Sequence, residues 1–365
     1  MAYRPVCPRI VTRYVCLRFA NLFLFCLCAL STICLLVEFF ERIDNLMAQN
    51  LSIWLMFQYL VYRLPQVIFQ MILPVAVLMG ILLTLGGMAK DGELIALLAG
   101  GINLFQIILP LLMICMGLSV LSGFYQESLA PVLKQESAMR LALIKGERVQ
   151  RKLPQGRMWL AGKQGRFFHL QVLDSEVQSL TGVTVFEVDE SFQLKKRWDI
   201  QKCFYRQGLW HLHDGQIWDF DKGMPEFEKI SYKIVAWPEE FLDFARIQKD
   251  PAEMKYAELK QYVQRLEEWG YDATVQKTDL YFRWAFPLTC FIFGLLGIPF
   301  AVRLHRGVKY LSLGLALGIS FVYWIIMNVG VSMAHAGMIP PLMGAWTGHI
   351  LFGLLGCVLM FRIRT

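Results

Sequence analysis

Residues 88–107, MAKDGELIALLAGGINLFQI, form a short charged segment between two long apolar runs that cover residues 59–87 and 103–129. A bilayer core of about 30 Å requires roughly 20 apolar residues in a helix, and both runs are long enough. The same length criterion is met at residues 14–40, 280–302, 310–331 and 342–361. We therefore expect an α-helical membrane protein with six transmembrane helices, arranged as three plus three.

The composition supports this class. Of the 365 residues, 56% are hydrophobic and only 18% are charged, which is typical of an integral membrane protein. The first apolar run is too long for a cleaved signal peptide, and no small-residue cleavage pattern precedes Glu38. We interpret it as a retained anchor.

Basic residues predict the orientation in the membrane. Lys and Arg favour the cytoplasmic side, and six spans bring three basic clusters to one side. These clusters precede the first span, separate the fourth and fifth spans, and follow the sixth: Arg4, Arg9, Arg13 and Arg18; Arg303, Arg306 and Lys309; Arg362 and Arg364. Both termini, the 88–102 connection and the 303–309 loop are then cytoplasmic. The net charge of +7 reflects this topology, so we predict no nucleic-acid partner.

The long connection between the third and fourth spans has a different composition from the spans. Short β-branched and aromatic segments such as VTVFEV and KISYKIVAW are separated by turn residues, which predicts an antiparallel sandwich or jelly roll. Helices are expected on both sides, at 131–148 and from Pro251 to Gly270. The predicted parts are residues 1–130, 131–279 and 280–365, with the β-domain away from the cytoplasm. The alternative is that the β region is a cytoplasmic ligand-binding domain. Every basic loop would then lie outside the cytoplasm, against the preference of Lys and Arg for the cytoplasmic side.

Residue patterns for catalysis are missing from the sequence. There is no P-loop, GxSxG, HExxH or metal-ligand spacing, so we predict no catalytic or metal site and no cofactor bound by this chain. His211 and His213 alternate on one strand face, which suits either a metal or two surface residues beside a turn. Glu38 and Glu41 fall at the outer end of the first span, where we expect them to be solvated. Cys203 is the single cysteine of the β region, so no internal disulfide is expected there.

The 88–102 connection predicts a compact cytoplasmic helix. Asp91 suits an N-cap and the positive end of the helix dipole, and Gly100-Gly101 would end the helix. Its apolar face is formed by Leu94, Ile95, Leu97 and Leu98. Such a helix could dock into a groove on another protein, or it could be an ordinary interfacial loop helix. The pattern leaves both interpretations open.

Several segments in a fixed order resemble a known family. They are VEFFERIDNLM (37–47), MAKDGELIALLAGG (88–101), YQESLAP (125–131), YAELKQYVQRLEEWGYD (256–272), RWAFPLTCFIFGLLGIPFAVR (283–303), GISFVYWI (318–325) and AGMIPPLMGAW (336–346). Together they resemble the LptF/LptG permeases, the membrane subunits of the lipopolysaccharide exporter. The resemblance covers nearly the whole chain, and the FERID ending of the first span favours the G-type.

The resemblance implies a permease subunit of an ABC transporter in the bacterial inner membrane. Two similar permeases would sit on an LptB-like cytoplasmic ATPase dimer that uses ATP, which agrees with the missing P-loop. The coupling helix, 89–101, would contact the ATPase through Asp91, Gly92, Glu93, Leu94, Leu97 and Leu98. Lipopolysaccharide would be extracted from the outer leaflet and passed to a periplasmic bridge of an LptC-like anchored jelly-roll protein and LptA-like domains. The alternatives are a non-transporting scaffold that displays a β-domain, or an exporter of a different glycolipid.

The first span departs from the family pattern. Several relatives carry lysines at its top that bind lipid phosphates, whereas this chain has Glu38, Glu41, Arg42 and Asp44. A lysine is also usual at the start of the fourth span, where this chain has Arg283. The candidate headgroup ligands are therefore Arg283, which we expect to contribute most, with Arg42 and Arg63. The alternatives are that each arginine only extends to the interface, or that the partner permease supplies the contacts.

The β-domain has two predicted properties. Its edge strands could pair with the next jelly roll of a bridge. We expect its interior to include Phe167, Phe186, Phe204 and Trp210, and this interior would either bind acyl chains or be a filled core.

Overall fold

The structure is a computed structural model that describes residues 8–362, except for 49–51, 145–157, 163–164, 175–177, 190–191, 221–225, 240, 242–250, 269–270 and 304–308. Arg4, Arg306, Arg364 and the predicted helix end at Gly270 lie outside the described residues, as do residues 145–148 of the predicted 131–148 helix. The chain divides into two compact units. The first comprises Met1–Gly146, Lys255–Val263 and Asp272–Thr365, and the second comprises Glu147–Met254 and Gln264–Tyr271.

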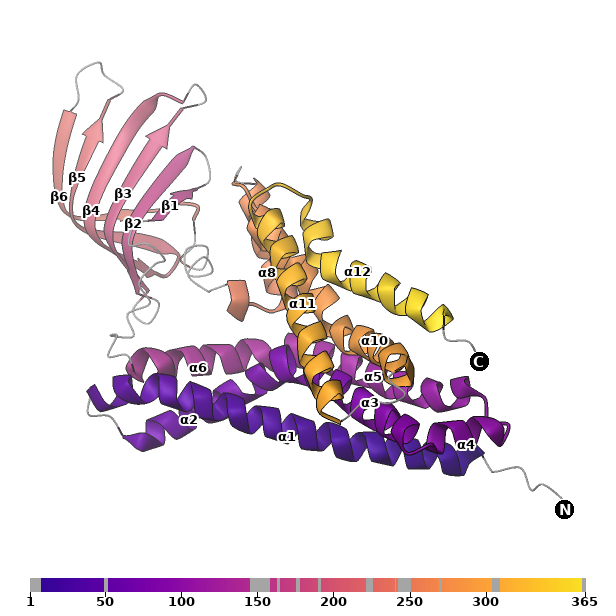
Figure 1. Ribbon diagram of the computed structural model, residues 1–365. Coiled ribbons are helices and arrows are strands. Elements are labelled where there is room, and N and C mark those ends of the chain that lie inside the picture. Colours follow the sequence, from indigo (N-terminus) through magenta and orange to yellow (C-terminus); the bar gives the residue numbers. More distant parts are fainter. Residues whose placement is uncertain are drawn as a thin grey trace. The chain divides into compact units, whose positions relative to one another are not determined.

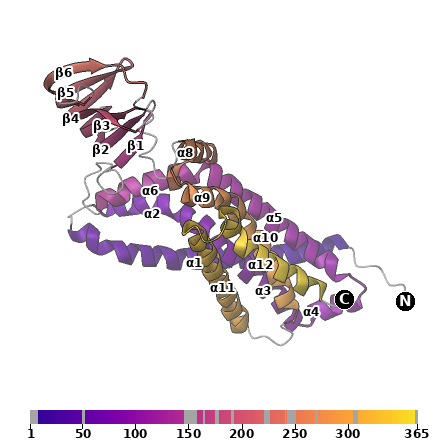
Figure 2. The same ribbon diagram turned by 90° about the horizontal axis from the view of Figure 1, so that it is seen from above.

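The first unit is helical (Figures 1 and 2). In chain order its helices are α1 (Pro8–Ala48), α2 (Ile53–Val67), a π-helical turn (Ile68–Ile72), α3 (Leu73–Lys90), α4 (Glu93–Ala99), α5 (Leu104–Ser128), α6 (Ala130–Ile144), α9 (Thr274–Ala285), a 3₁₀ turn (Phe286–Leu288), α10 (Thr289–Arg303), α11 (Lys309–His335) and α12 (Pro341–Phe361). Helix α8 (Tyr256–Glu268), preceded by a 3₁₀ turn at Pro251–Glu253, is the predicted amphipathic helix.

Six stretches are long and apolar enough to cross a membrane, which confirms the predicted number of spans. They are Ile10–Asp44, Ile53–Lys90, Leu104–Ser128, Thr274–Arg303, Leu311–His335 and Pro341–Phe361. The second stretch combines α2, the π turn and α3. Pro65 and Pro74 flank the π turn, and each lacks the N–H that a regular helix would use.

Helix α3 is the centre of the first unit, and most of its residues are buried. Small residues allow its neighbours to approach closely. A Cβ on Gly297 of α10 would lie 3.1 Å from the side chains of Ile81 and Leu78, and a Cβ on Gly80 would lie 3.1 Å from Phe19 of α1. Close backbone approach at small residues is the usual way in which membrane helices pack. Towards the C-terminal end of α1, helices α1, α2 and α6 lie side by side (Figures 1 and 2).

The second unit is a curved antiparallel sheet (Figure 1). Its strands are β1 (Met158–Ala161), β2 (Arg166–Asp174), β3 (Ser179–Val188), β4 (Leu194–Arg206), β5 (Leu209–Asp219) and β6 (Glu226–Val235). Each strand pairs with the next one in sequence, so β1 and β6 are the edges. The predicted inserted β-domain is thus confirmed, and its described strands form one meandering sheet rather than two packed sheets.

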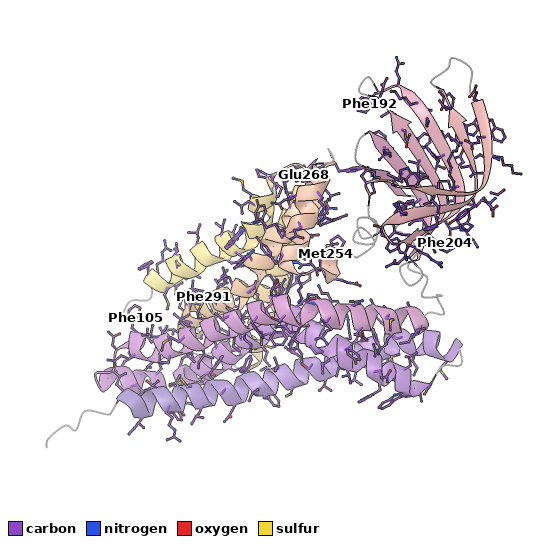
Figure 3. The ribbon with its side chains drawn as sticks, turned by 180° about the vertical axis from the view of Figure 1, so that it is seen from behind. Phe105, Phe192, Phe204, Met254, Glu268 and Phe291 are labelled. Atoms are coloured by element: carbon purple, nitrogen blue, oxygen red, sulfur yellow. The ribbon has the colours of Figure 1, made fainter. Side chains whose placement is uncertain are left out.

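The buried face of this sheet differs from the expected one. Phe168, Trp198 and Trp210 are buried in its core, whereas Phe167, Phe186 and Phe204 lie on the opposite, more exposed face. Figure 3 shows the side chains of the sheet, including Phe204. The prediction was right for Trp210 and wrong for the three phenylalanines. Side chains alternate between the two faces of a strand, so choosing the wrong neighbour of a pair such as Phe167 and Phe168 inverts the assignment.

Candidate coupling and lipid-binding sites

The corner between α3 and α4 is shaped by glycines. Gly92 has φ of 75° and occupies the N-cap of α4 without a side-chain cap hydrogen bond. The predicted N-cap role of Asp91 is therefore wrong: Asp91 ends α3, and its carboxylate contacts Arg18 instead. At the other end Gly101 has φ of 82°. Its N–H donates to the Leu98 carbonyl at 3.0 Å, and the Ile102 N–H donates to the Leu97 carbonyl at 3.1 Å. This Schellman motif confirms the predicted glycine end of the helix.

Helix α4 presents only part of its predicted apolar face. Leu94 is buried, and Leu97 is partly buried against the helical core. Ile95 and Leu98 remain 56% and 41% exposed. The first pair anchors the helix to its own unit, and the second pair is available to a partner.

Arg18 of α1 holds this corner through several contacts. Its Nη1 donates to both carboxylate oxygens of Glu93, at 2.9 and 2.7 Å, and to the Tyr14 hydroxyl at 2.8 Å. The Tyr14 hydroxyl in turn donates to Glu93 Oε2 at 3.0 Å. The Nη2 atom of Arg18 lies 3.3 Å from Asp91 Oδ2. Sequence reasoning placed Arg18 only in a basic cluster and missed this contact, because residues 18 and 93 are brought together only by the fold.

Arg42 and Arg63 form a second cluster, on α1 and α2. Both approach Glu38: Arg42 Nη2 lies 3.4 Å and Arg63 Nε lies 3.8 Å from Glu38 Oε1. The Tyr59 hydroxyl also donates to Glu38. The side chain of Glu38 is only 16% exposed, so the expectation that it is solvated was wrong. Two guanidinium groups share one carboxylate, which leaves this arginine–glutamate cluster with an excess positive charge.

Helix α6 extends this cluster. Arg63 Nη1 donates to Gln66 Oε1 at 2.9 Å, and Gln66 Nε2 donates to Ser137 Oγ at 2.9 Å. One turn further, Arg140 pairs with Glu136 and lies over the Tyr62 ring at 4.1 Å. The i, i+4 spacing of Glu136 and Arg140 was the sequence signal that could have indicated this pair.

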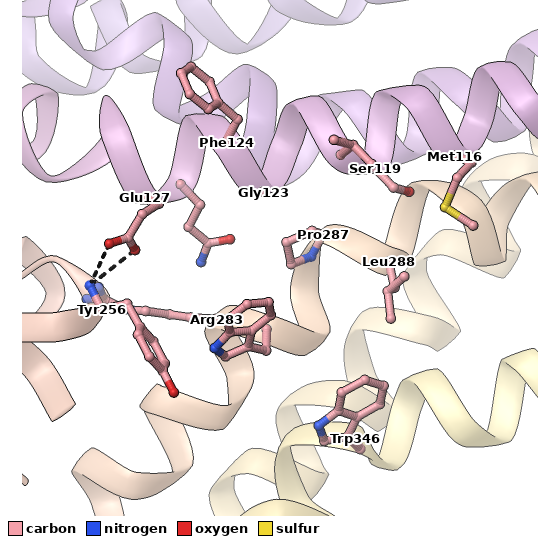
Figure 4. A pocket seen from close by; sticks show the side chains of 13 residues that line it. Met116, Ser119, Gly123, Phe124, Glu127, Tyr256, Arg283, Pro287, Leu288 and Trp346 are labelled. Carbon is pink, nitrogen blue, oxygen red and sulfur yellow. Dashed lines mark hydrogen bonds between the residues drawn. The ribbon is translucent and has the colours of Figure 1, made fainter.

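Arg283 lies at a separate site, beside a pocket of about 630 Å³ in the first unit (Figure 4). Most of the pocket wall is apolar, from Met116, Val120, Phe124, Trp284, Pro287, Leu288 and Trp346. Gln126, Glu127, Tyr256 and Arg283 add polar groups to the lining. The Glu127 carboxylate accepts a hydrogen bond from the backbone N–H of Tyr256, with distances of 3.1 and 3.3 Å to its two oxygens.

The electrostatic surroundings of Arg283 differ from those of Arg42 and Arg63. Three carboxylates, Glu127, Asp279 and Glu258, act on its guanidinium. Asp279 also lies 3.2 Å from Nε2 of His335. One arginine near three carboxylates has no local excess of positive charge. The structure thus brings Arg42 and Arg63 together and places Arg283 elsewhere.

A buried polar cluster in the spans was not predicted. The Thr289 hydroxyl, the Tyr323 hydroxyl and Nε2 of His349 lie 3.1 to 3.2 Å from one another, on α10, α11 and α12. All three residues are buried. Polar side chains that bond across membrane helices stabilise their packing.

Aromatic and aliphatic side chains of the β-domain pack together in one buried core. Trp237 and Phe241, from the segment after β6, pack in the same core as Trp198 and Trp210. The Trp210 Nε1–H donates to the Glu239 carbonyl at 2.8 Å, which fixes this segment against the sheet. Burial raises the pKa of the Cys203 thiol, which keeps it neutral and unreactive. On the opposite face, His211 and His213 both contact the ring of Tyr232.

Comparison with known proteins agrees with this architecture. A family model described as "Lipopolysaccharide export system permease LptF/LptG" matches residues 13–362. The lipopolysaccharide export system permease protein LptG of Escherichia coli K12 is 23% identical over 322 residues, which cover 80% of this chain and 82% of the relative. LptG of E. coli O6:H1 strain CFT073 matches to the same extent. With the family model matching nearly its full length, the chain belongs to the LptF/LptG family of lipopolysaccharide export permeases.

Proposed function

We propose that this chain is a transport subunit of an ABC transporter that extracts lipopolysaccharide from the outer leaflet of the inner membrane and passes it to a periplasmic bridge. It is a multi-pass membrane protein of the lipopolysaccharide-export permease family. The observation that carries the proposal is α4: a short helix between two spans that presents Ile95 and Leu98, in a chain whose sequence contains no P-loop.

The first part of the proposal is an ATPase in trans. An exposed apolar pair on a short helix suits docking into a groove of another protein. We assign this role to an LptB-like ATPase dimer on the cytoplasmic side, where both termini would also lie. A second LptF- or LptG-like permease would complete the membrane part. Asp91, Gly92, Glu93, Leu94 and Leu97 shape and hold the coupling helix, and Leu98 with Ile95 contacts the ATPase.

The second part is recognition of the lipid. Guanidinium groups bind phosphate with charge-assisted hydrogen bonds, and a net positive site is needed to compensate a phosphorylated headgroup. The excess charge around Glu38 favours Arg42 and Arg63 for this role. We rank Arg283 below them because of its three carboxylates, which reverses the order expected from sequence.

The third part is the transfer of lipid out of the membrane. The β-domain would lie in the periplasm, and β1 and β6 are the outer strands, at the two edges of the described sheet. Such edges accept an additional strand, so we assign them to an LptC-like or LptA-like jelly-roll partner. The packed aromatic core supports an edge contact over passage of acyl chains through the interior.

Co-purification tests the proposal directly. The chain, a second permease and the ATPase are co-expressed, and complex formation and lipopolysaccharide-dependent ATP hydrolysis are measured. Replacing Ile95 and Leu98 together by Asp should abolish co-purification of the ATPase, because two charges cannot enter an apolar groove unpaired. The matched control replaces Phe192 and Leu194, exposed before and at the start of β4 in the β-domain, by Asp. Equal binding by the α4 variant and the wild type would reject α4 as the docking element, as a scaffold would require.

A further inference from the structure

We propose that Arg18 is a positioning residue that ties the coupling helix to α1, so that movement of α4 reaches the Arg42–Glu38–Arg63 cluster through one continuous helix. The inference deepens the proposed function and depends on it. It concerns how the ATPase contact is transmitted through this chain, rather than where the contact lies.

The geometry at Arg18 joins three elements. Its guanidinium bonds Glu93 at the start of α4 and Asp91 at the end of α3, while Tyr14, one turn earlier on α1, bonds the same Glu93 carboxylate. Charge-assisted hydrogen bonds are the strong class. The Arg18 side chain is 25% exposed, that of Glu93 is 35% exposed and that of Asp91 is 52% exposed, so the Glu93 contact is the less screened of the two. The α3–α4 corner therefore cannot shift along α1 without breaking several bonds at once.

This arrangement changes the expected role of Glu93. The Glu93 carboxylate accepts from Arg18 and Tyr14 within its own chain, while the same Arg18 guanidinium also contacts Asp91, so one cation is shared by two carboxylates. Glu93 is therefore a structural part of this corner, whether or not a basic residue of the ATPase also approaches it. Glu93 thus holds α4 on α1, and Ile95 and Leu98 offer the apolar contact to the ATPase.

Helix α1 is suited to carry the movement further. It is 41 residues long, and after Pro8 it contains neither Pro nor Gly, the residues at which helices usually kink. Arg18 and Glu38 are 20 residues apart, about 30 Å along a helix, which is the thickness of a bilayer core. Figure 1 shows α4 beside the N-terminal part of α1, and α2 and α6 beside its other end. One rigid element thus connects the ATPase-contact end with the charged cluster.

The test uses the full complex in nanodiscs that contain lipopolysaccharide, with ATP hydrolysis and lipopolysaccharide release measured together. Arg18→Gln should keep the ATPase bound, since Ile95 and Leu98 are unchanged, and should lower the lipid released per ATP several-fold. The matched control is Arg13→Gln, one and a half turns earlier on α1, where the side chain is exposed and outside the contact. This control should match the wild type.

A charge exchange distinguishes coupling from simple damage to the fold. Arg18→Glu should be worse than Arg18→Gln, because the introduced carboxylate would face the carboxylates of Glu93 and Asp91. The double variant Arg18→Glu with Glu93→Arg should recover at least half of the wild-type lipid release per ATP, which repacking alone would not produce.

Two results would overturn the inference: release per ATP in Arg18→Gln equal to that in Arg13→Gln, or no recovery in the exchanged pair. Failure of the proposed function would appear differently. In that case the wild-type complex itself would show no lipopolysaccharide-dependent ATP hydrolysis, whatever residue occupies position 18.

Discussion

The arginines of the Glu38 cluster and the arginine of the pocket have opposite surroundings. Arg42 and Arg63 lie 3.4 and 3.8 Å from the same Glu38 carboxylate, whereas Arg283 is half-buried and lies in the field of three carboxylates, those of Glu127, Asp279 and Glu258. All three residues carry the same charge and lie near the ends of membrane spans, so the sequence ranked them only by position. The comparison teaches that equal formal charges at the ends of spans can have different local charge balances, and we therefore expect phosphate at Arg42 and Arg63 rather than at Arg283.

The largest expected effect is at the cluster. Replacing Arg42 and Arg63 together by Gln should reduce co-purifying lipopolysaccharide by about tenfold or more. Charge-assisted hydrogen bonds contribute roughly 1.5–3 kcal/mol each, and partial exposure places these at the low end. The amount of lipid per mole of purified complex measures this, and unchanged loading would mean that the partner permease recognises the headgroup.

Removing the shared carboxylate of Glu38 tests its contribution to the stability of the membrane unit. Glu38→Gln leaves two half-buried guanidinium groups without their counter-ion and weakens the Tyr59 contact. We expect a loss of about 1 kcal/mol in the free energy of unfolding of the membrane unit, discounted for exposure. Thermal unfolding in detergent checks this. Glu41→Gln, on the same helix and exposed, is the control and should leave the melting temperature unchanged.

Neutralising a carboxylate beside the pocket should increase the amount of bound lipid. Glu127→Gln removes one of the three negative charges that act on Arg283 while keeping an acceptor for the Tyr256 N–H. We expect co-purifying lipopolysaccharide to rise by about two- to threefold, because one screened interaction is worth up to roughly 1 kcal/mol. A decrease would show that Glu127 itself contributes to lipid binding.

The smallest expected effect is that of Arg283→Gln. Its lipopolysaccharide loading should stay within about twofold of the wild type, since the positive charge that is lost is already compensated. A tenfold loss in this variant, with the double variant of Arg42 and Arg63 unaffected, would restore the order expected from sequence and break the comparison.

The sequence by itself determined the class of the protein and much of its layout. Long apolar runs must become helices in a bilayer because no water satisfies their backbone groups, so six spans could be predicted from composition and length. The glycine end of α4 was also local information, since only a residue that tolerates positive φ can close a Schellman motif. The β-domain followed from strand-like segments separated by turns.

Only the tertiary structure decided which charges meet. Arg18 and Glu93 are 75 residues apart, and no pattern along the chain links them. The N-cap of α4 is Gly92 rather than Asp91 because the turn between α3 and α4 takes a positive φ, which glycine adopts without strain. Glu38 is the centre of a cluster because α2 packs against α1. The core face of the sheet was likewise set by pairing register. Electrostatic interactions act across space, whereas a sequence orders residues along the chain, so the partner of each charge becomes known only once the helices are packed.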